Sequence, residues 1–197
     1  MANNWSRNLF TANKKLTVIN FFGGAGVGKS TIAAELFAKM KKNNYKVELI
    51  HEVAKDLVWE EAFHIFGEQD YIFALQHRLT RRLTRHDIDY AIVDSSILLS
   101  LFYMPWDFPI TFKPFVEEVF ESYDNINIIL DRNLAIPYIQ AGRNESEEQA
   151  KAVDEQISRF FDFDRPLWKK HHVLAGETAL NECYRIVEQH VKPSVPA

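Results

Sequence analysis

Cysteine, glycine and proline are all scarce in this sequence of 197 residues, which has one Cys, seven Gly and seven Pro. The single Cys183 cannot form a disulfide framework or a thiolate metal site within one chain, so we expect a reducing, cytoplasmic compartment. No apolar run approaches the length of a membrane span, and segment 1–15 lacks the apolar core of a signal peptide. Net positive charge is lacking too: the formal charge of −4 argues against broad charge-driven binding to DNA or membranes and leaves room only for a local basic groove.

Hydrophobic residues, by contrast, make up 47% of the chain and include 15 Phe. This is enough apolar material for one folded core, and the length fits a single domain over residues 1–197. The sequence has no repeat, no low-complexity tract and no internal linker. Residues 1–15 are expected to form an N-terminal extension, and residues 192–197, with two prolines, a frayed tail.

Short apolar runs alternate with segments of helical periodicity, which is typical of βα units and a parallel sheet. The expected strands are Leu16–Phe22, Lys46–His51, Tyr90–Asp94, Ile126–Leu130 and His172–Ala175. The expected helices are Ser30–Lys42, Ala54–Phe66, Gln69–His86, Ile97–Tyr103, Phe112–Ser122, Ser146–Phe161 and Glu177–His190. We therefore predict an α/β fold with a doubly wound five-stranded parallel sheet in the order 2-3-1-4-5. Such sheets bind ligands at the carboxyl ends of their strands, so the strand-ending residues are the first place to look for function.

The first expected strand is followed by a glycine-rich loop that fits the Walker A pattern G-x-x-x-x-G-K-[ST] at every fixed position. The loop reads Gly23, Gly24, Ala25, Gly26, Val27, Gly28, Lys29, Ser30, and Thr31 follows in the helix. The glycines let the backbone N–H groups turn toward a phosphate, and the following helix points its positive end at the same spot. Lys29 is expected to reach the outer phosphates of ATP, and the Ser30 hydroxyl to bind Mg²⁺. The alternative is a glycine-rich turn that binds nothing.

A carboxylate ends the third expected strand, which lies beside the first, and another ends the second strand, which lies across the pocket from the loop. Asp94 closes the run Ala91–Asp94, the position of the Walker B-like acid that organises Mg²⁺; the alternative is an N-cap for the next helix. Glu52 ends the second strand, where it would accept the proton of a substrate hydroxyl; the alternative is an acid stabilised by a helix dipole. The sequence leaves open whether Glu52 or Asp94 is the base.

Two arginines that follow the fourth expected strand are candidates for contact with ATP or its transferring phosphoryl group. Arg143 lies beside Gly142 in a lid-like segment, 133–148, where its guanidinium would offset the charge of a transferring phosphoryl group. The alternative is a loop arginine paired with the nearby acids that open the next helix. Arg132 is a second candidate for contact with ATP.

The helix expected over 69–86 is rich in arginine, and Arg78, Arg82 and Arg85 share one of its faces. A solvated face explains the later arginines, whereas Gln76 and Arg78 are placed where a kinase lines its acceptor pocket. Trp106, in an aromatic loop with prolines, is a candidate for stacking on a base, or else for pinning the loop to the core.

These motifs together resemble the small P-loop kinases related to nucleoside and nucleotide kinases. The resemblance is strongest to a compact class common in bacteriophage genomes and often labelled AAA-type ATPase, and ribosylnicotinamide kinase domains share the layout. It is carried by GGAGVGKS at 23–30, HEVAKD at 51–56, QDYIF at 69–73 with QHR at 76–78, VDS at 93–95, and PYIQAGR at 137–143. It implies MgATP as donor, a hydroxyl-bearing nucleoside-type acceptor, Glu52 as base and Arg143 in a lid. Some phage relatives phosphorylate 5-hydroxymethyldeoxyuridine within DNA, a step of DNA modification.

The sequence therefore predicts a transferase that moves the γ-phosphoryl group of ATP to a nucleoside-type hydroxyl, with 5-hydroxymethyluracil in phage DNA as the specific acceptor. The alternatives within this class are a free nucleoside, a nucleoside monophosphate or ribosylnicotinamide. An ATPase switch acting on a protein partner is an alternative of another class. A GTPase is disfavoured because Asp131-Arg132-Asn133, rather than a guanine-reading Asn-Lys-x-Asp, follows the fourth strand. If phage-encoded, the protein would act in the host cytoplasm without a membrane, and its oligomeric state, a homodimer included, is left open.

Overall fold

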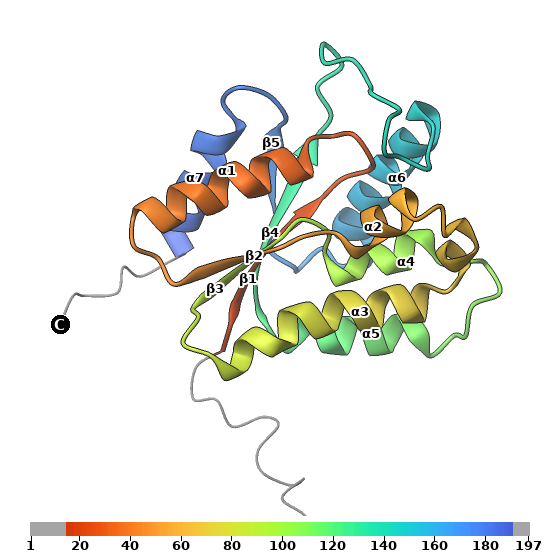
Figure 1. Cartoon of the computed structure of the whole chain (residues 1–197), viewed down its shortest axis with the longest axis horizontal. Coiled ribbons are helices and arrows are strands. Elements are labelled where there is room, and N and C mark those ends of the chain that lie inside the picture. The colour runs from red at the N-terminus through yellow and green to blue at the C-terminus, as the bar shows by residue number, and fades with distance from the viewer. Residues whose placement is uncertain (1–14, 191–197) are drawn as a thin grey trace, which may run out of the picture.

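The computed structural model describes residues 15–190 (Figure 1). Segments 1–14 and 191–197, which contain nearly all of the expected N-terminal extension and the whole expected tail, lie outside the described residues.

Five parallel strands form one sheet. They are β1 (Thr17–Phe22), β2 (Val47–Ile50), β3 (Tyr90–Val93), β4 (Asp124–Asp131) and β5 (His171–Leu174). Their order is β2-β3-β1-β4-β5, so the predicted α/β class and strand order are confirmed. The central strand β1 is buried from Val18 onward because helices cover both faces of the sheet, as all-parallel sheets require.

Helices flank the sheet on two sides (Figure 1). They are α1 (Lys29–Lys42), α2 (Val53–Trp59), α3 (Gln69–Arg81), α4 (Ser100–Tyr103), α5 (Phe112–Glu121), α6 (Glu147–Arg159) and α7 (Ala179–His190). Helices α1 and α7 pack together over one face, in a core that includes Leu36, Met40 and Ile186. On the other face, α3, α5 and α6 close a core rich in phenylalanine. The two layers leave the carboxyl ends of the strands open to ligands.

Seven helices are expected, and residues 15–190 contain seven α-helices. The expectation differs from the structure in helix type, because several expected helices include 3₁₀ or π segments. The segment expected over 54–66 is α2, then a turn in which Glu61 adopts φ +55°, then a 3₁₀ helix η2 (Phe63–Gly67). No glycine or proline marks that break. Other expected helices also change type: α3 continues as the 3₁₀ helix η3 (Arg82–Arg85), α4 is preceded by the 3₁₀ helix η4 (Ile97–Leu99), and α6 runs into the π-helix η5 (Phe160–Asp164). These departures follow tertiary packing, which overrides local helical periodicity.

The sheet brings the predicted strand-end residues to one edge. β1 lies between β3 and β4, in a register that pairs Asn20 with Val93 on one side and Asn127 on the other. The loop after β1, Asp94 after β3 and Arg132 after β4 therefore emerge side by side. Among residues 15–190, no helix has the length and apolar character needed to cross a membrane.

Candidate active site: a cavity between the P-loop and a lid

A cavity of about 410 Å³ opens at the carboxyl edge of the sheet. Its walls come from the glycine-rich loop and the start of α1, from the segment that begins α2, from α3, from the β3–α4 connection and from the lid-like segment. Its polar lining residues include Lys29, Ser30, Thr31, Glu52, Lys55, Gln69, Gln76, Ser95, Ser96, Tyr103, Arg143, Asn144 and Glu145. Val58, Phe66, Ile72 and Leu99 supply apolar walls. This mixture is typical of a site for an organic ligand that carries charged groups.

The glycine-rich loop needs its glycines for conformation and for space. Gly26 has φ +74°, and a Cβ there would lie 2.7 Å from the Tyr138 ring of the lid-like segment. Gly28 has φ +107° and caps α1, which begins at Lys29. The loop therefore turns sharply into the helix N-terminus, whose free N–H groups and positive dipole end favour a phosphate.

Lys29 is the cation of the loop. Only 7% of its surface is exposed, and its ammonium donates to the carbonyls of Gly23 (2.7 Å) and Gly24 (3.1 Å). An ammonium has three donors, so one is left for a further oxygen acceptor. The carbonyls hold the charge at the cavity wall, where a phosphate group would need it.

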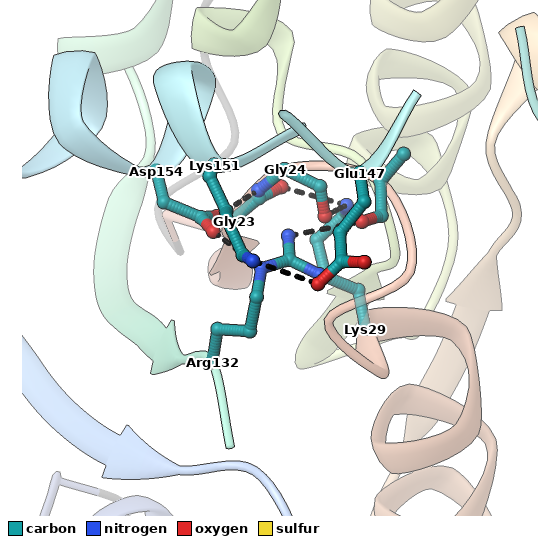
Figure 2. Close-up of polar contacts among 8 residues, drawn as sticks. Gly23, Gly24, Lys29, Arg132, Glu147, Lys151 and Asp154 are labelled. Carbon is teal, nitrogen blue, oxygen red and sulfur yellow. Dashed lines mark hydrogen bonds and ion pairs between the residues drawn. The ribbon is translucent and has the colours of Figure 1, made fainter. Parts of the chain in front are cut away.

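The loop is tied to α6 through one carboxylate (Figure 2). Asp154 accepts a hydrogen bond from the Gly24 N–H (2.6 Å) and an ion-paired one from Arg132 Nε (2.7 Å). Arg132 donates in addition to the Ala25 carbonyl (3.0 Å). A Cβ on Gly24 would lie 2.1 Å from the Ala150 carbonyl, so α6 lies directly against the loop. Arg132, predicted to contact ATP, is therefore engaged with the loop's own backbone.

Glu52 lines the cavity at the start of α2. Burial raises the pKa of its carboxyl group, the Lys29 ammonium opposes the rise, and the carboxylates of Asp94 and Glu145 add to it. Lys29 and Glu52, which follow two different strands, line the same cavity, and Asp94, at the end of a third strand, acts on the Glu52 pKa without lining the cavity itself. A carboxylate whose pKa is raised is a stronger proton acceptor.

Gln76 lines the same cavity from α3, but its amide is committed to the backbone. Its Oε1 accepts from the Val53 N–H (3.0 Å), and its Nε2 donates to the His51 carbonyl (3.2 Å). Both atoms of the amide are used on the two residues that flank Glu52. Gln76, predicted to bind substrate, lines the cavity, and its amide also fixes the backbone on both sides of Glu52.

Asp94 is 5% exposed, and its Oδ1 has no hydrogen-bond partner among the described residues. A buried carboxylate oxygen without a partner fits a cation or its water ligands. Mg²⁺ in phosphoryl-transfer sites binds through one or two protein groups and completes its shell with phosphates and water. Within residues 15–190 no cluster of three or more His, Cys, Asp or Glu side chains could hold a metal unaided. Ser30 and Asp94 therefore fit Mg²⁺ that arrives with a nucleotide.

The lid-like segment carries Arg143 over the loop. The guanidinium lies 5.3 Å from the Tyr138 ring centroid, and its Nη1 is buried with no partner in the described part of the chain. Gly142, at φ +73°, packs against Trp59 of α2, since a Cβ there would lie 2.9 Å from its ring. The segment thus bridges the loop and α2, and its Arg143 lines the cavity.

Several cavity residues were not among the predicted site residues, and Gln69, Tyr103 and Glu145 are the most notable of them. Gln69 is 3% exposed and begins α3. Burial raises the pKa of Tyr103, and the Glu145 carboxylate, which interacts with its hydroxyl, raises it further. Tyr103 ends an expected helix and Glu145 lies in the lid-like segment, but nothing local in the sequence indicates that α4 and this segment meet.

Two predicted substrate residues do not line this cavity. Trp106 is 96% exposed in the loop between α4 and α5. Arg78 is exposed and lines a groove on another face of α3. The helical face that reaches the cavity carries Gln69, Ile72 and Gln76 instead.

The fold and the loop together define a P-loop protein with the kinase type of sheet order. A family model described as AAA domain matches residues 18–167, and the chain belongs to that family. No curated protein sequence matches the chain.

Solved structures share the fold at low identity. The NadR protein in complex with NR superposes with a TM-score of 0.68 at 16% identity, over 92% of this chain and 54% of that chain. NadR with NAD and AMP-PNP gives 0.59 at 15% identity, over 92% and 52%. Deoxyadenosine kinase from M. mycoides with bound dATP gives 0.54 at 18% identity, over 89% and 98%. The chain therefore spans about half the length of the NadR chains and nearly all of the deoxyadenosine kinase.

Proposed function

We propose that the protein is an ATP-dependent kinase that transfers the γ-phosphoryl group to a hydroxyl group of a nucleoside-type acceptor. The observation that carries the proposal is that Lys29 and Glu52 line one cavity, where burial raises the pKa of the carboxyl group and the ammonium opposes the rise. A phosphate-binding loop alone would serve any P-loop protein. A partly buried carboxylate facing it supplies the proton acceptor that transfer to a hydroxyl needs.

The donor half of the site is the loop. Lys29, Ser30 and the N–H groups at the start of α1 would bind the phosphates, with Thr31 beside them. Ser30 and Asp94 would hold Mg²⁺, which when bound neutralises charge on the transferring group. Arg132 would act indirectly, because its bonds to Asp154 and the Ala25 carbonyl fix the loop.

The acceptor half is the wall formed by α2, α3 and α4. Glu52 would accept the proton of the attacking hydroxyl. At the same time the hydroxyl oxygen would bond to the γ-phosphorus, and the bond between that phosphorus and the ADP leaving group would break. Arg143, which lines the cavity and whose buried Nη1 has no partner among the described residues, would stabilise charge on the phosphoryl oxygens. The lid-like segment would exclude water, which competes with the acceptor.

The acceptor that we propose is a nucleoside-type molecule, and specifically the 5-hydroxymethyluracil base in phage DNA. The named neighbours, a deoxyadenosine kinase and a protein in complex with NR, support a nucleoside-type acceptor. The sequence resemblance to phage kinases supports a base in DNA, which would have to leave the base stack to enter the cavity. A free nucleoside, a nucleoside monophosphate or ribosylnicotinamide is the alternative acceptor.

The test is transfer of label from γ-labelled ATP to a panel of free nucleosides, nucleotides, ribosylnicotinamide, plain DNA and DNA containing 5-hydroxymethyluracil. We expect label on a nucleoside-type acceptor, and Glu52→Gln to bind ATP while losing nearly all transfer. Label released only as inorganic phosphate, whatever the acceptor, would contradict the kinase proposal and favour an ATPase switch.

A further inference from the structure

A second hollow lies outside the proposed active site. It measures about 980 Å³ and runs between the α3–η3 helix and the start of α5, which lie side by side in Figure 1. It is lined by Asp70, Phe73, Ala74, His77, Arg78, Arg81, Arg82, Arg85, Phe108, Pro109, Thr111, Phe112 and Phe115. We call it the arginine groove. None of its lining residues borders the cavity described above.

Positive charge is concentrated in this groove. Four arginines line it against one carboxylate, that of Asp70. Burial lowers the pKa of His77, and the neighbouring Arg81 lowers it further, so both disfavour an additional positive charge on the ring. Within residues 15–190, no ion pair or side-chain hydrogen bond engages the four guanidinium groups. On a chain of net charge −4, such a row is complementary to a polyanion.

The arrangement of the groove favours a nucleic-acid strand over other polyanions. Arg78, Arg82 and Arg85 follow one face over seven residues, or roughly 10 Å at the helical rise, a row long enough to follow a backbone. Aromatic rings form the facing wall: Phe115 is 52% exposed and packs edge-on to Phe73 at 5.5 Å, and Phe108 is half-buried. A cationic row opposite an exposed aromatic ring, here that of Phe115, is the combination that proteins use to bind single strands, with phosphates on arginine and a base stacked on the ring.

We propose that the arginine groove binds single-stranded DNA, with phosphates on Arg78, Arg82 and Arg85 and a base against Phe115. The groove and the cavity lie on two faces of α3: Ile72 and Gln76 line the cavity, whereas Phe73 and His77, each one residue further, line the groove. A strand in the groove therefore passes within about a helix diameter, 10–12 Å, of the acceptor wall. This inference deepens the proposed function. The purpose of binding a strand rests on the proposed kinase activity, whereas the affinity of the groove for the strand does not.

The first test is binding of a fluorescent single-stranded oligonucleotide of about 12 nucleotides, measured by anisotropy over a range of salt. Arg82→Gln/Arg85→Gln is compared with Lys42→Gln/Lys169→Gln, which removes the same charge from exposed sites outside the groove. We expect the slope of log K against log salt to fall by about 1.4 for the arginine variant, from two lost single-strand contacts. Its affinity should fall at least tenfold, and the lysine variant should bind like the wild-type protein.

Equal loss in both variants, or wild-type binding by the arginine variant, would overturn the proposal, and so would the absence of binding by the wild-type protein. Polyglutamate is the probe for an acidic protein partner: binding as tight as that of the oligonucleotide would assign the groove to that class instead. Tighter binding of a duplex than of the single strand would likewise contradict the assignment.

The second test isolates stacking. Phe115→Leu keeps apolar bulk but removes the ring, and it should weaken oligonucleotide binding about fivefold, the lower end of what stacking contributes. An oligonucleotide with abasic sites should bind both proteins equally, which a packing defect would not produce. An equal loss with both oligonucleotides would remove the stacking role.

The choice of acceptor in the transfer assay distinguishes a failure of the proposed function from a failure of this inference. Arg82→Gln/Arg85→Gln lies outside the cavity, so transfer to a free nucleoside acceptor should be unchanged while transfer to a strand-borne acceptor falls in proportion to binding. Strand binding without transfer to any acceptor would contradict the proposed kinase activity but support the proposed strand binding by the groove. Transfer without strand binding would support the kinase activity and contradict strand binding by the groove.

Discussion

Gln76 brackets Glu52 from a neighbouring helix: its amide oxygen accepts from the residue after Glu52, and its amide nitrogen donates to the residue before it. The base proposed for the reaction is thus held through its backbone rather than through its carboxylate. The carboxylate itself remains free to face the cavity and take a proton. Gln76 is 4% exposed, so water does not compete for these bonds.

Gln76→Leu should therefore lower kcat with little change in the KM for ATP. Leucine preserves the buried volume but leaves the Val53 N–H and the His51 carbonyl unpaired, at a cost of about 1–3 kcal/mol in stability. The measurement is steady-state kinetics beside a thermal melt. Gln76→Glu is the matched control for the acceptor bond to Val53, and partial recovery of kcat is expected. A higher KM for the acceptor at unchanged kcat would show instead that Gln76 binds substrate.

The raised pKa of Glu52 makes activity and stability respond to pH in opposite directions. Transfer needs the carboxylate, so kcat should rise with pH through a pKa above the ordinary value of 4.5. Ionisation in the buried site costs stability, so the stabilising effect of a protonated Glu52 is fully present below 4.5 and is lost as pH rises through the folded-state pKa. Glu52→Gln should gain stability relative to the wild-type protein across that window. Parallel melting curves of the two proteins from pH 4 to 8 would contradict the burial of this carboxyl.

Arg143→Lys should reduce kcat by about 10³-fold or more, the lower bound for an arginine that stabilises phosphoryl-transfer charge. Lysine keeps the charge but loses the planar group that lies over Tyr138 and the buried Nη1, which has no partner among the described residues. ATP affinity, measured by calorimetry, should change much less. If lysine supports normal turnover, charge alone suffices and the geometry of the guanidinium is irrelevant.

Asp94→Asn should raise the Mg²⁺ concentration needed for half-maximal transfer. The amide removes one negative charge and places a donor where a buried, unpartnered carboxylate oxygen faces the proposed ion. A magnesium titration at saturating ATP measures this, and Mn²⁺, which binds such sites more tightly, should restore part of the rate. An unchanged titration would exclude Asp94 from the magnesium site, and helix capping would not explain its position either, because the N-cap of η4 is Ser96.

Gly24→Ala should lower the melting temperature and weaken ATP binding together. The added Cβ would meet the Ala150 carbonyl at 2.1 Å, so either α6 or the loop must move. A loss of about 2 kcal/mol corresponds to roughly 4–8 °C for a chain of this size. Gly67→Ala is the control, since a Cβ there meets nothing within 4 Å and Gly67 has no positive φ. Similar melts for the two variants would show that α6 does not restrain the loop.

The sequence predicted the parts of the site that are local. The loop at 23–30 and the strand-end positions of Glu52 and Asp94 follow from short-range patterns, and sheet topology then brings them together. The roles of Tyr103 and Glu145 in the cavity were not predicted. Their contact depends on how the lid-like segment lies over α4, and it joins positions about 40 residues apart.

Arg78 lies outside the predicted acceptor pocket for a related reason. Gln76 and Arg78 stand two residues apart, yet a helix turns about 200° over that distance, so one reaches the cavity and the other the arginine groove. Periodicity shows which residues share a face but not what that face packs against. The end of α2 at Trp59 could not be predicted either, because Glu61 adopts φ +55° at a position where the sequence has no glycine.

The bond between Gly24 and Asp154 joins residues 130 positions apart in the chain. The phosphate-binding loop is therefore not a self-contained motif in this protein: its shape is finished only when the last third of the chain has folded against it. A nascent chain that ends before α6 would carry the whole glycine-rich sequence without a completed donor site. Substitutions at Ala150, Asp154 or Arg132 should accordingly behave in a genetic screen like lesions of the loop itself.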